Sequence, residues 1–137
     1  MVWLQDDNTR MPITEKRKIG EWGEEQAALF LIRHGYEIVE RNYRTKMGEL
    51  DIIAWGVIRG QRTLCFIEVK TRGYGVGSAE RATQGPKLPR MLTTARHFCL
   101  TNKISIDTTP IQFEQVSVYV NKRTGTVSLK KYVIPVG

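Results

Sequence analysis

The sequence predicts an α/β domain with a mixed β-sheet flanked by helices, in the order α-β-β-β-α-β-β. Three observations support this prediction. Two segments show the apolar spacing of amphipathic helices, five segments are short and rich in β-branched and aromatic residues, and glycine-bearing stretches separate several of them. The chain has 137 residues, of which 41% are hydrophobic, so it can build one core.

The first half of the predicted domain is a helix followed by three strands. The helix covers residues 19–34 and ends at Gly35, because glycine suits the conformation that follows a helix. The three strands follow at residues 37–43, 48–55 and 63–71. The short glycine-bearing loop between the last two predicts an antiparallel hairpin. The polar segment 1–18 is predicted to be a leader, and residues 19–137 a single domain.

The second half begins with a glycine-rich loop at 72–85. A second helix starts between Pro86 and Pro89, since proline suits the first turn. Its apolar residues fall on one face of a helix, at Leu88, Met91, Leu92, Ala95, Phe98 and Cys99. Two further strands are predicted at 111–120 and 127–134.

The chain is basic, with a formal net charge of +7. The stretch from Arg41 to Lys103 holds twelve Lys and Arg residues but only four acids. Such an excess favours a polyanion as partner, whereas a solvated basic surface is the simpler alternative. The two cysteines are predicted to be buried thiols. No signal peptide or membrane span is recognisable, so a cytoplasmic location without membrane contact is expected.

Acidic side chains interrupt two of the predicted strands. Asp51 lies in the second strand and Glu68 in the third, where an isolated buried charge would be costly. The two carboxylates can meet around a divalent cation, and Lys70 shares a strand face with Glu68. A metal-dependent nuclease needs hard oxygen ligands and a nearby cation. The alternative is an ion cluster on an edge strand, in which Glu68 and Lys70 pair with each other.

Alternation assigns these side chains to faces of the strands. Leu50, Ile52 and Ala54 are predicted to share one face of the second strand, and Glu49, Asp51 and Ile53 the other. In the third strand, Leu64, Phe66, Glu68 and Lys70 are predicted to share a face.

Glu24, on the first helix, is a further candidate. Ala27, Ala28 and Leu31 fall within roughly 60° of it around the helix axis, so its carboxylate is expected to face the sheet. The alternative is a glutamate that faces solvent.

These segments resemble a known group of enzymes. Gly48-Glu49-Leu50-Asp51 and the stretch from Phe66 to Arg72 resemble the signature of PD-(D/E)XK nucleases, although Leu50 stands where that name has proline. The wider pattern, over about residues 19–120, resembles the bacterial YraN family, which is related to archaeal Holliday-junction resolvases. The match includes Gly23-Glu24 with Ala27 and Ala28, Gly35-Tyr36, Asn42-Tyr43-Arg44 and Lys87. The family usually has Phe-Asp where this chain has Phe113-Glu114.

The resemblance implies a restriction-endonuclease-like core and a Mg²⁺-dependent endonuclease, with Mn²⁺ as a possible substitute. It implies catalytic roles for Glu24, Asp51, Glu68 and Lys70, with the three acids as metal ligands. Glu49 matches the family motif as a site residue or a turn cap. The implied substrate is DNA, including branched or junction structures in repair or recombination. Because resolvase relatives cut two strands with symmetric sites, a homodimer is plausible.

Five basic residues are expected to hold the phosphates that flank the cleaved bond, namely Arg44, Lys46, Arg72, Lys87 and Arg90. Two other functions remain open at this point. One is a nucleic-acid-binding module that keeps the fold without catalysis. The other is a protein-interaction subunit whose basic face meets an acidic partner.

Overall fold

The structure is a computed structural model that describes residues 2–3, 16–72, 87–121 and 123–136. Its elements are β1 (Val2–Trp3), α1 (Lys16–Arg33), β2 (Glu37–Thr45), β3 (Gly48–Ile58), β4 (Gln61–Arg72), α3 (Lys87–Thr101), β5 (Ile111–Val120) and β6 (Thr126–Val133). The predicted α/β class and element order are confirmed. The short β1 and the first turn of α1 fall within the segment predicted as a leader, most of which lies outside the described residues.

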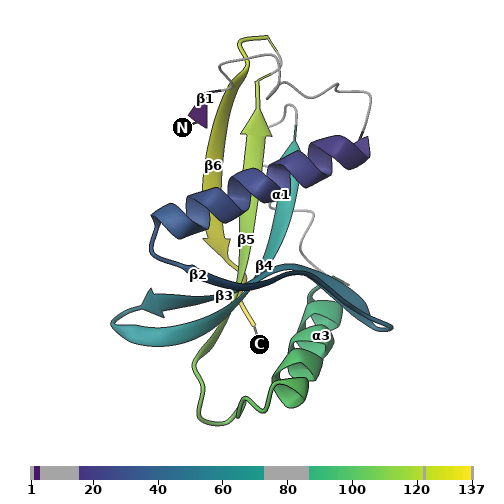
Figure 1. Ribbon diagram of the computed structural model, residues 1–137, viewed down its shortest axis with the longest axis vertical. Coiled ribbons are helices and arrows are strands. Elements are labelled where there is room, and N and C mark those ends of the chain that lie inside the picture. The colour runs from purple at the N-terminus through teal and green to yellow at the C-terminus, as the bar shows by residue number, and fades with distance from the viewer. Residues whose placement is uncertain (1, 4–15, 73–86, 122, 137) are drawn as a thin grey trace.

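The strands form one mixed sheet in the order β1-β6-β5-β4-β3-β2. Strands β4 and β5 are parallel, and all other neighbours are antiparallel. In Figure 1, α1 crosses one face of this sheet and α3 lies beside the β2–β3 hairpin. Strand β2 is an edge of the described sheet, and its register with β3 shifts between Ile38 and Glu40, which leaves Val39 as a β-bulge.

Two apolar clusters pack on the two faces of the sheet. Cys65 and Ile67 of β4 belong to the cluster that contains the buried residues of α1. Leu64 and Phe66, on the other face of the same strand, belong to the cluster that contains the buried residues of α3. The predicted face of Leu64 and Phe66 is therefore confirmed, and within the described residues one helix covers each face of the sheet.

The turn between β3 and β4 is tighter than the loop predicted at 56–62. Ile58 pairs with Gln61, so only Arg59 and Gly60 connect the strands. Both residues have positive φ, +52° and +79°, which is the conformation that a two-residue type I′ turn requires. The prediction failed here because the apolar strand pattern continues to Ile58 and arginine is not a typical residue for this conformation.

Strand β3 departs from the alternation that the sequence predicts. Ile52 faces α1, but Leu50, predicted to share its face, packs on the α3 side together with Ile53. The change of side occurs at Asp51, which stands opposite Asn42 in the register of β2 and β3. Asn42 has a left-handed φ of +54°, so the regular ladder is interrupted at this point.

Both cysteines are free and buried, as the sequence predicts. Burial raises the pKa of each thiol, and the charge of Glu114 adds to the effect at Cys65. Among the described helices, neither α1 nor α3 has the length and apolarity needed to cross a membrane.

Candidate functional site

The site is built around the point where β3 and β4 separate. Their pairing runs from Ile58 and Gln61 to Ile52 and Ile67. Asp51, the next residue of β3, uses its side chain in place of the backbone. Its Oδ2 accepts a hydrogen bond of 2.7 Å from the Val69 amide. The Asp51 carboxylate is thereby fixed beside β4, one residue from Glu68, although the alternation of β3 is broken.

Glu68 and Lys70 form an ion pair inside the sheet. Glu68 is only 4% exposed, and its Oε1 lies 3.4 Å from the Lys70 ammonium, whose side chain is 21% exposed. The alternative interpretation was correct that these residues pair. It was wrong about an edge strand, because β4 lies between β3 and β5. A pair in this position has lost most of its hydration, so it is costly to keep without a functional reason.

Glu24 joins this acidic group from α1. It is half-buried and lies one turn from Ala27 and Ala28, which are fully or nearly fully buried against the sheet. Burial raises the pKa of its carboxyl group. The positive charge of Arg41 lowers this pKa, and the negative charges of Glu49 and Glu68 raise it. The negative charge of Glu68 therefore acts on the Glu24 carboxyl group.

Gly23 brings α1 close to β4. A Cβ atom added at this position would overlap the Thr71 side chain, including its Oγ1. The helix backbone can therefore contact β4 near the end of the strand, and this contact places the following residue, Glu24, near the separation of β3 and β4.

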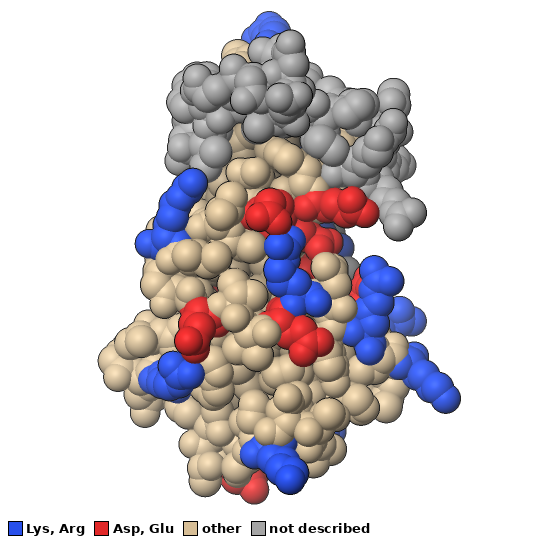
Figure 2. All heavy atoms as spheres, viewed as in Figure 1, with Lys and Arg blue, Asp and Glu red and all other residues tan. Residues whose placement is uncertain are grey.

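Sequence reasoning missed Arg41. Its guanidinium lies 2.8 Å from Glu25, and its charge lowers the pKa of Glu24. Figure 2 shows acidic and basic side chains gathered side by side over α1 and the strands beneath it. The sequence indicated the role of Arg41 only through its position opposite Ile52, and this position follows only once the register of β2 and β3 is known.

The acids fit a hard divalent cation only in part. Among the described residues, no group of three or more His, Cys, Asp and Glu side chains is arranged to hold a metal ion. Asp51 and Glu68 offer carboxylate oxygens on two adjacent strands, and the repulsion felt by Glu24 is of the kind that a cation relieves. Mg²⁺ commonly binds through one or two carboxylates and completes its shell with water and substrate phosphate.

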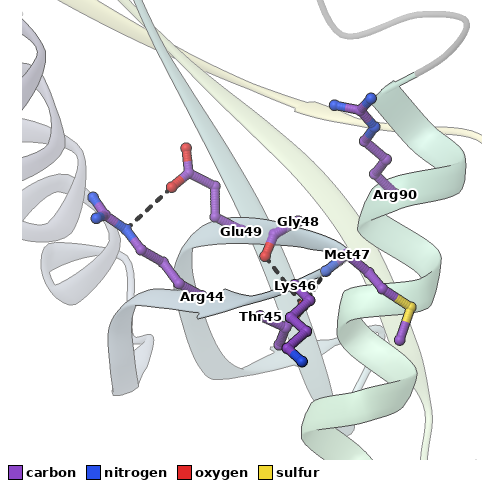
Figure 3. A pocket seen from close by; sticks show the side chains of 7 residues that line it. All are labelled: Arg44, Thr45, Lys46, Met47, Gly48, Glu49 and Arg90. Atoms are coloured by element: carbon purple, nitrogen blue, oxygen red, sulfur yellow. Dashed lines mark hydrogen bonds and ion pairs between the residues drawn. The ribbon is translucent and has the colours of Figure 1, made fainter.

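A pocket of about 480 Å³ lies where the β2–β3 turn meets α3 (Figure 3). It is lined by Arg44, Thr45, Lys46, Met47, Gly48, Glu49 and Arg90. Three of the five basic residues expected to contact phosphate are thus brought together. Figure 3 shows Arg44 and Arg90 on opposite sides of the Gly48–Glu49 backbone. An exposed ion pair of 3.2 Å joins Arg44 to Glu49, and such a pair contributes little stability.

The other two predicted phosphate contacts are not part of this pocket. Arg72 is half-buried at the end of β4. Lys87 is the first residue of α3, but its side chain lies outside the described residues, as does the predicted loop 72–85 beyond Arg72.

A second buried carboxylate, Glu114, lies on the face that α1 covers. Its two oxygens accept hydrogen bonds of 2.9 and 3.0 Å from the Tyr36 hydroxyl, and Gln112 and Lys131 lie 2.6 and 3.6 Å away. Burial and the Glu114 charge raise the pKa of Tyr36, and they raise that of Cys65 to about 12. The carboxylate ties the segment after α1 to the sheet, and sequence reasoning assigned it no role.

Comparison with known proteins places the chain in a family. A model of the uncharacterised protein family UPF0102 matches residues 23–118. A UPF0102 protein of Koribacter versatilis is 39% identical over 120 residues, which cover 85% of this chain and 79% of the relative. A relative from Desulforamulus reducens is 36% identical over 117 residues, which cover 85% of this chain and 93% of the relative. A relative from Corynebacterium efficiens is 42% identical over 119 residues, which cover 82% of this chain and 86% of the relative. The predicted YraN-like membership is thereby confirmed at family level: the chain belongs to the UPF0102 family.

Proposed function

We propose that this protein is a metal-dependent nuclease that hydrolyses phosphodiester bonds in DNA. One observation carries the proposal. The Asp51 carboxylate takes the place of a backbone partner beside β4, next to the buried Glu68–Lys70 pair. The resemblance to PD-(D/E)XK nucleases, which places its motif on the same residues, supports this function.

The acids make better sense as ligands than as structural groups. A buried ion pair is often no more stabilising than apolar residues of the same size, so stability alone does not explain Glu68 and Lys70. Mg²⁺ or Mn²⁺ bound by Asp51 and Glu68, with Glu24 as a further ligand, would acidify a bound water and stabilise charge on the phosphate. Clusters of acids whose charges disturb one another are typical of such sites.

The chain's own groups have separate tasks in this proposal. Asp51 and Glu68 bind the cation and fix its position, because one is anchored to the Val69 amide and the other is buried. The Lys70 ammonium orients the attacking water and stabilises negative charge that develops on the phosphate. Holding these groups in place before substrate arrives lowers the cost of reaching the transition state.

In this proposal the basic pocket binds the phosphates of the substrate. Arg44, Lys46 and Arg90 surround a space next to Glu49, whose charge also acts on Glu24 of the acidic group. Phosphates on either side of the cleaved bond would contact these cations, which hold position without reading bases. The net charge of +7 favours the approach of a polyanion.

A cleavage panel tests the proposal. Purified protein is incubated with Mg²⁺ or Mn²⁺ and labelled duplex, single-stranded, flap and four-way DNA. Wild type should cut at least one substrate, while Asp51→Ala, Glu68→Gln and Lys70→Ala should not. Thr63→Val is the matched control, since it changes a buried hydroxyl of β4 at the opposite end of the strand. Absence of cleavage across the panel, with both metals, would refute the proposal.

A nucleic-acid-binding module without catalysis is the second candidate. The observation in its favour is that the described residues contain no three ready metal-ligating side chains. Calorimetric titration separates the two functions. A nuclease should bind Mg²⁺ or Mn²⁺ at a site that Asp51→Ala removes, whereas a simple binder should bind DNA but show no such site.

A further inference from the structure

Strands β4 and β5 run side by side in the middle of the sheet (Figure 1). On the face turned away from α1, their paired residues begin as an apolar core. Leu64 pairs with Ile111, and Phe66 pairs with Phe113, whose rings stack at 5.5 Å. These residues belong to the cluster that α3 covers.

The next two pairs on this face are polar. Glu68 pairs with Gln115, and Lys70 pairs with Ser117. The change from apolar to polar occurs where the pairing of β3 with β4 ends, one residue beyond Ile67. The polar block therefore begins at the candidate site and continues from β4 onto β5.

The polar residues of β5 are as buried as the apolar ones. Gln115 is 1% exposed and Ser117 is fully buried. The Gln115 amide donates a 2.8 Å hydrogen bond to the Ser117 hydroxyl. This bond connects residues i and i+2 of β5, just as the ion pair connects Glu68 to Lys70 on β4. Two short polar contacts thus run parallel on neighbouring strands, which lie roughly 4.8 Å apart.

A purely structural explanation accounts poorly for this arrangement. A buried amide and hydroxyl contribute little net stability even when they bond to each other, and apolar residues of similar shape serve a sheet centre equally well. Their neighbours on β4 are Glu68 and Lys70, the two residues whose orientation matters most for the proposed reaction. An amide and a hydroxyl offer both donors and acceptors, so they can support a carboxylate and an ammonium together.

We propose that Gln115 and Ser117 are positioning residues that hold Glu68 and Lys70 in their working geometry. The proposal rests on the nuclease function, because a fixed geometry matters only if Glu68 and Lys70 act on a substrate. In this role the β5 pair limits the rotamers of the two β4 side chains, and neither residue touches the substrate. Supporting groups of this kind affect catalysis by setting the orientation of the groups that do touch it.

The test is a double variant, Gln115→Leu with Ser117→Ala, which removes both partners of the β5 hydrogen bond. Because no unpaired partner is left in that bond, we expect the urea midpoint of unfolding to stay close to that of wild type. The kcat for cleavage should fall at least tenfold with KM nearly unchanged. Ser117→Thr, which keeps the hydroxyl, should retain more activity than Ser117→Ala. Thr63→Val, the buried-hydroxyl control on β4, should cleave like wild type.

A second readout keeps the two proposals distinguishable. The ¹⁵N–¹H signal of the Lys70 ammonium, assigned by its loss in Lys70→Ala, should be shifted and protected from exchange in wild type. It should move toward the position of free lysine in the double variant. If wild type cleaves nothing, the nuclease function fails, and the positioning role in catalysis fails with it. If wild type cleaves and the double variant matches it in kcat and in this signal, only the positioning role is overturned.

Discussion

Asp51 Oδ2 accepts a 2.7 Å hydrogen bond from the Val69 backbone nitrogen at the point where β3 leaves β4. A side chain here does what a backbone carbonyl does elsewhere in the ladder. The same carboxylate carries the negative charge that a cation site needs. Its structural task and its proposed chemical task can therefore be separated by substitution.

Asp51→Asn should keep the structural task and lose the chemical one. Asparagine retains an acceptor for the Val69 amide, so the free energy of unfolding should fall by less than about 1 kcal/mol. Asp51→Ala leaves that amide without this acceptor and should cost about 1–3 kcal/mol. Both variants should lose metal-dependent cleavage. Urea unfolding and the cleavage assay measure the two effects, and full activity in Asp51→Asn would contradict the assignment.

Glu24→Gln should stabilise the metal-free protein near neutral pH. Burial, with the charges of Glu49 and Glu68 added to it, raises the pKa of Glu24 in the fold. A raised carboxyl pKa means that the ionised form disfavours folding, so removal of the charge is favourable. The gain should disappear as the pH falls below 4.5, the ordinary glutamate value, because Glu24 is then protonated in both states.

The measurement for Glu24 is a pair of urea titrations at neutral and acidic pH. Glu40→Gln, at an exposed position of β2, is the matched control and should change stability little at either pH. In the presence of Mg²⁺ the stability advantage of Glu24→Gln over wild type should shrink or reverse. Ligand binding stabilises the wild type, and Glu24→Gln should show a smaller rise in Tm. An equal rise would exclude Glu24 as a ligand.

Gly23→Ala and Gly20→Ala should have opposite effects on the same helix. A Cβ at Gly23 would overlap the Thr71 side chain, so this substitution should cost about 1–3 kcal/mol and displace Glu24. Gly20 has no atom within 4 Å of an added Cβ, and alanine there should stabilise by about 0.5–1 kcal/mol. Thermal unfolding measures the stability of each variant, and the cleavage assay measures the effect of displacing Glu24. Thr71→Ala should partly rescue Gly23→Ala, and a neutral Gly23→Ala would disprove the close packing.

Tyr36→Phe should weaken the protein and change its response to alkali. The hydroxyl donates to a fully buried carboxylate, and loss of a hydrogen bond to a charged group costs about 1.5–3 kcal/mol. In wild type, burial and Glu114 raise the pKa of Tyr36 above its ordinary 10.0 and that of Cys65 from 9.0 to about 12. Both groups stay protonated in the fold, so their stabilising contribution is complete below pH 9.0 and declines above it. Tyr36→Phe should show a shallower decline in urea titrations between pH 9.0 and 12.

Arg44→Ala, Lys46→Ala and Arg90→Ala should each weaken DNA binding uniformly across sequences. Removal of one phosphate-binding cation should make the slope of log affinity against log salt shallower by about 0.9 for duplex DNA. Arg96→Ala is the control, because Arg96 is exposed on the same helix as Arg90 and does not line the pocket. Fluorescence anisotropy over a series of salt concentrations gives the slopes. If all four variants kept the slope of wild type, the pocket would bind no phosphate.

Local patterns were sufficient to predict most of the fold. The helical spacing of Met91, Ala95 and Phe98 identified α3 and its buried face, and Gly35 marked the end of α1 with a φ of +87°. The pairing of Glu68 with Lys70 could be foreseen, since residues i and i+2 of a regular strand share a face.

Long-range register decided what the sequence could not predict. The approach of Arg41 to Glu24 depends on how β2 is placed under α1, and no local pattern encodes that placement. The change of side at Asp51 coincides with the left-handed backbone of Asn42, a conformation in which asparagine is enriched but which most asparagines do not adopt. Gln115 looked like an ordinary polar residue until the pairing of β5 placed it beside Glu68.

The irregular backbone of β2 has a consequence for the behaviour of the protein in concentrated solution. An exposed outer strand offers a row of free amide and carbonyl groups to any other chain with an extended segment. In β2 the bulge at Val39 and the left-handed Asn42 break that row twice within nine residues. Uncontrolled strand-to-strand aggregation is therefore disfavoured by the same irregularity that turns Asp51 toward its place beside β4.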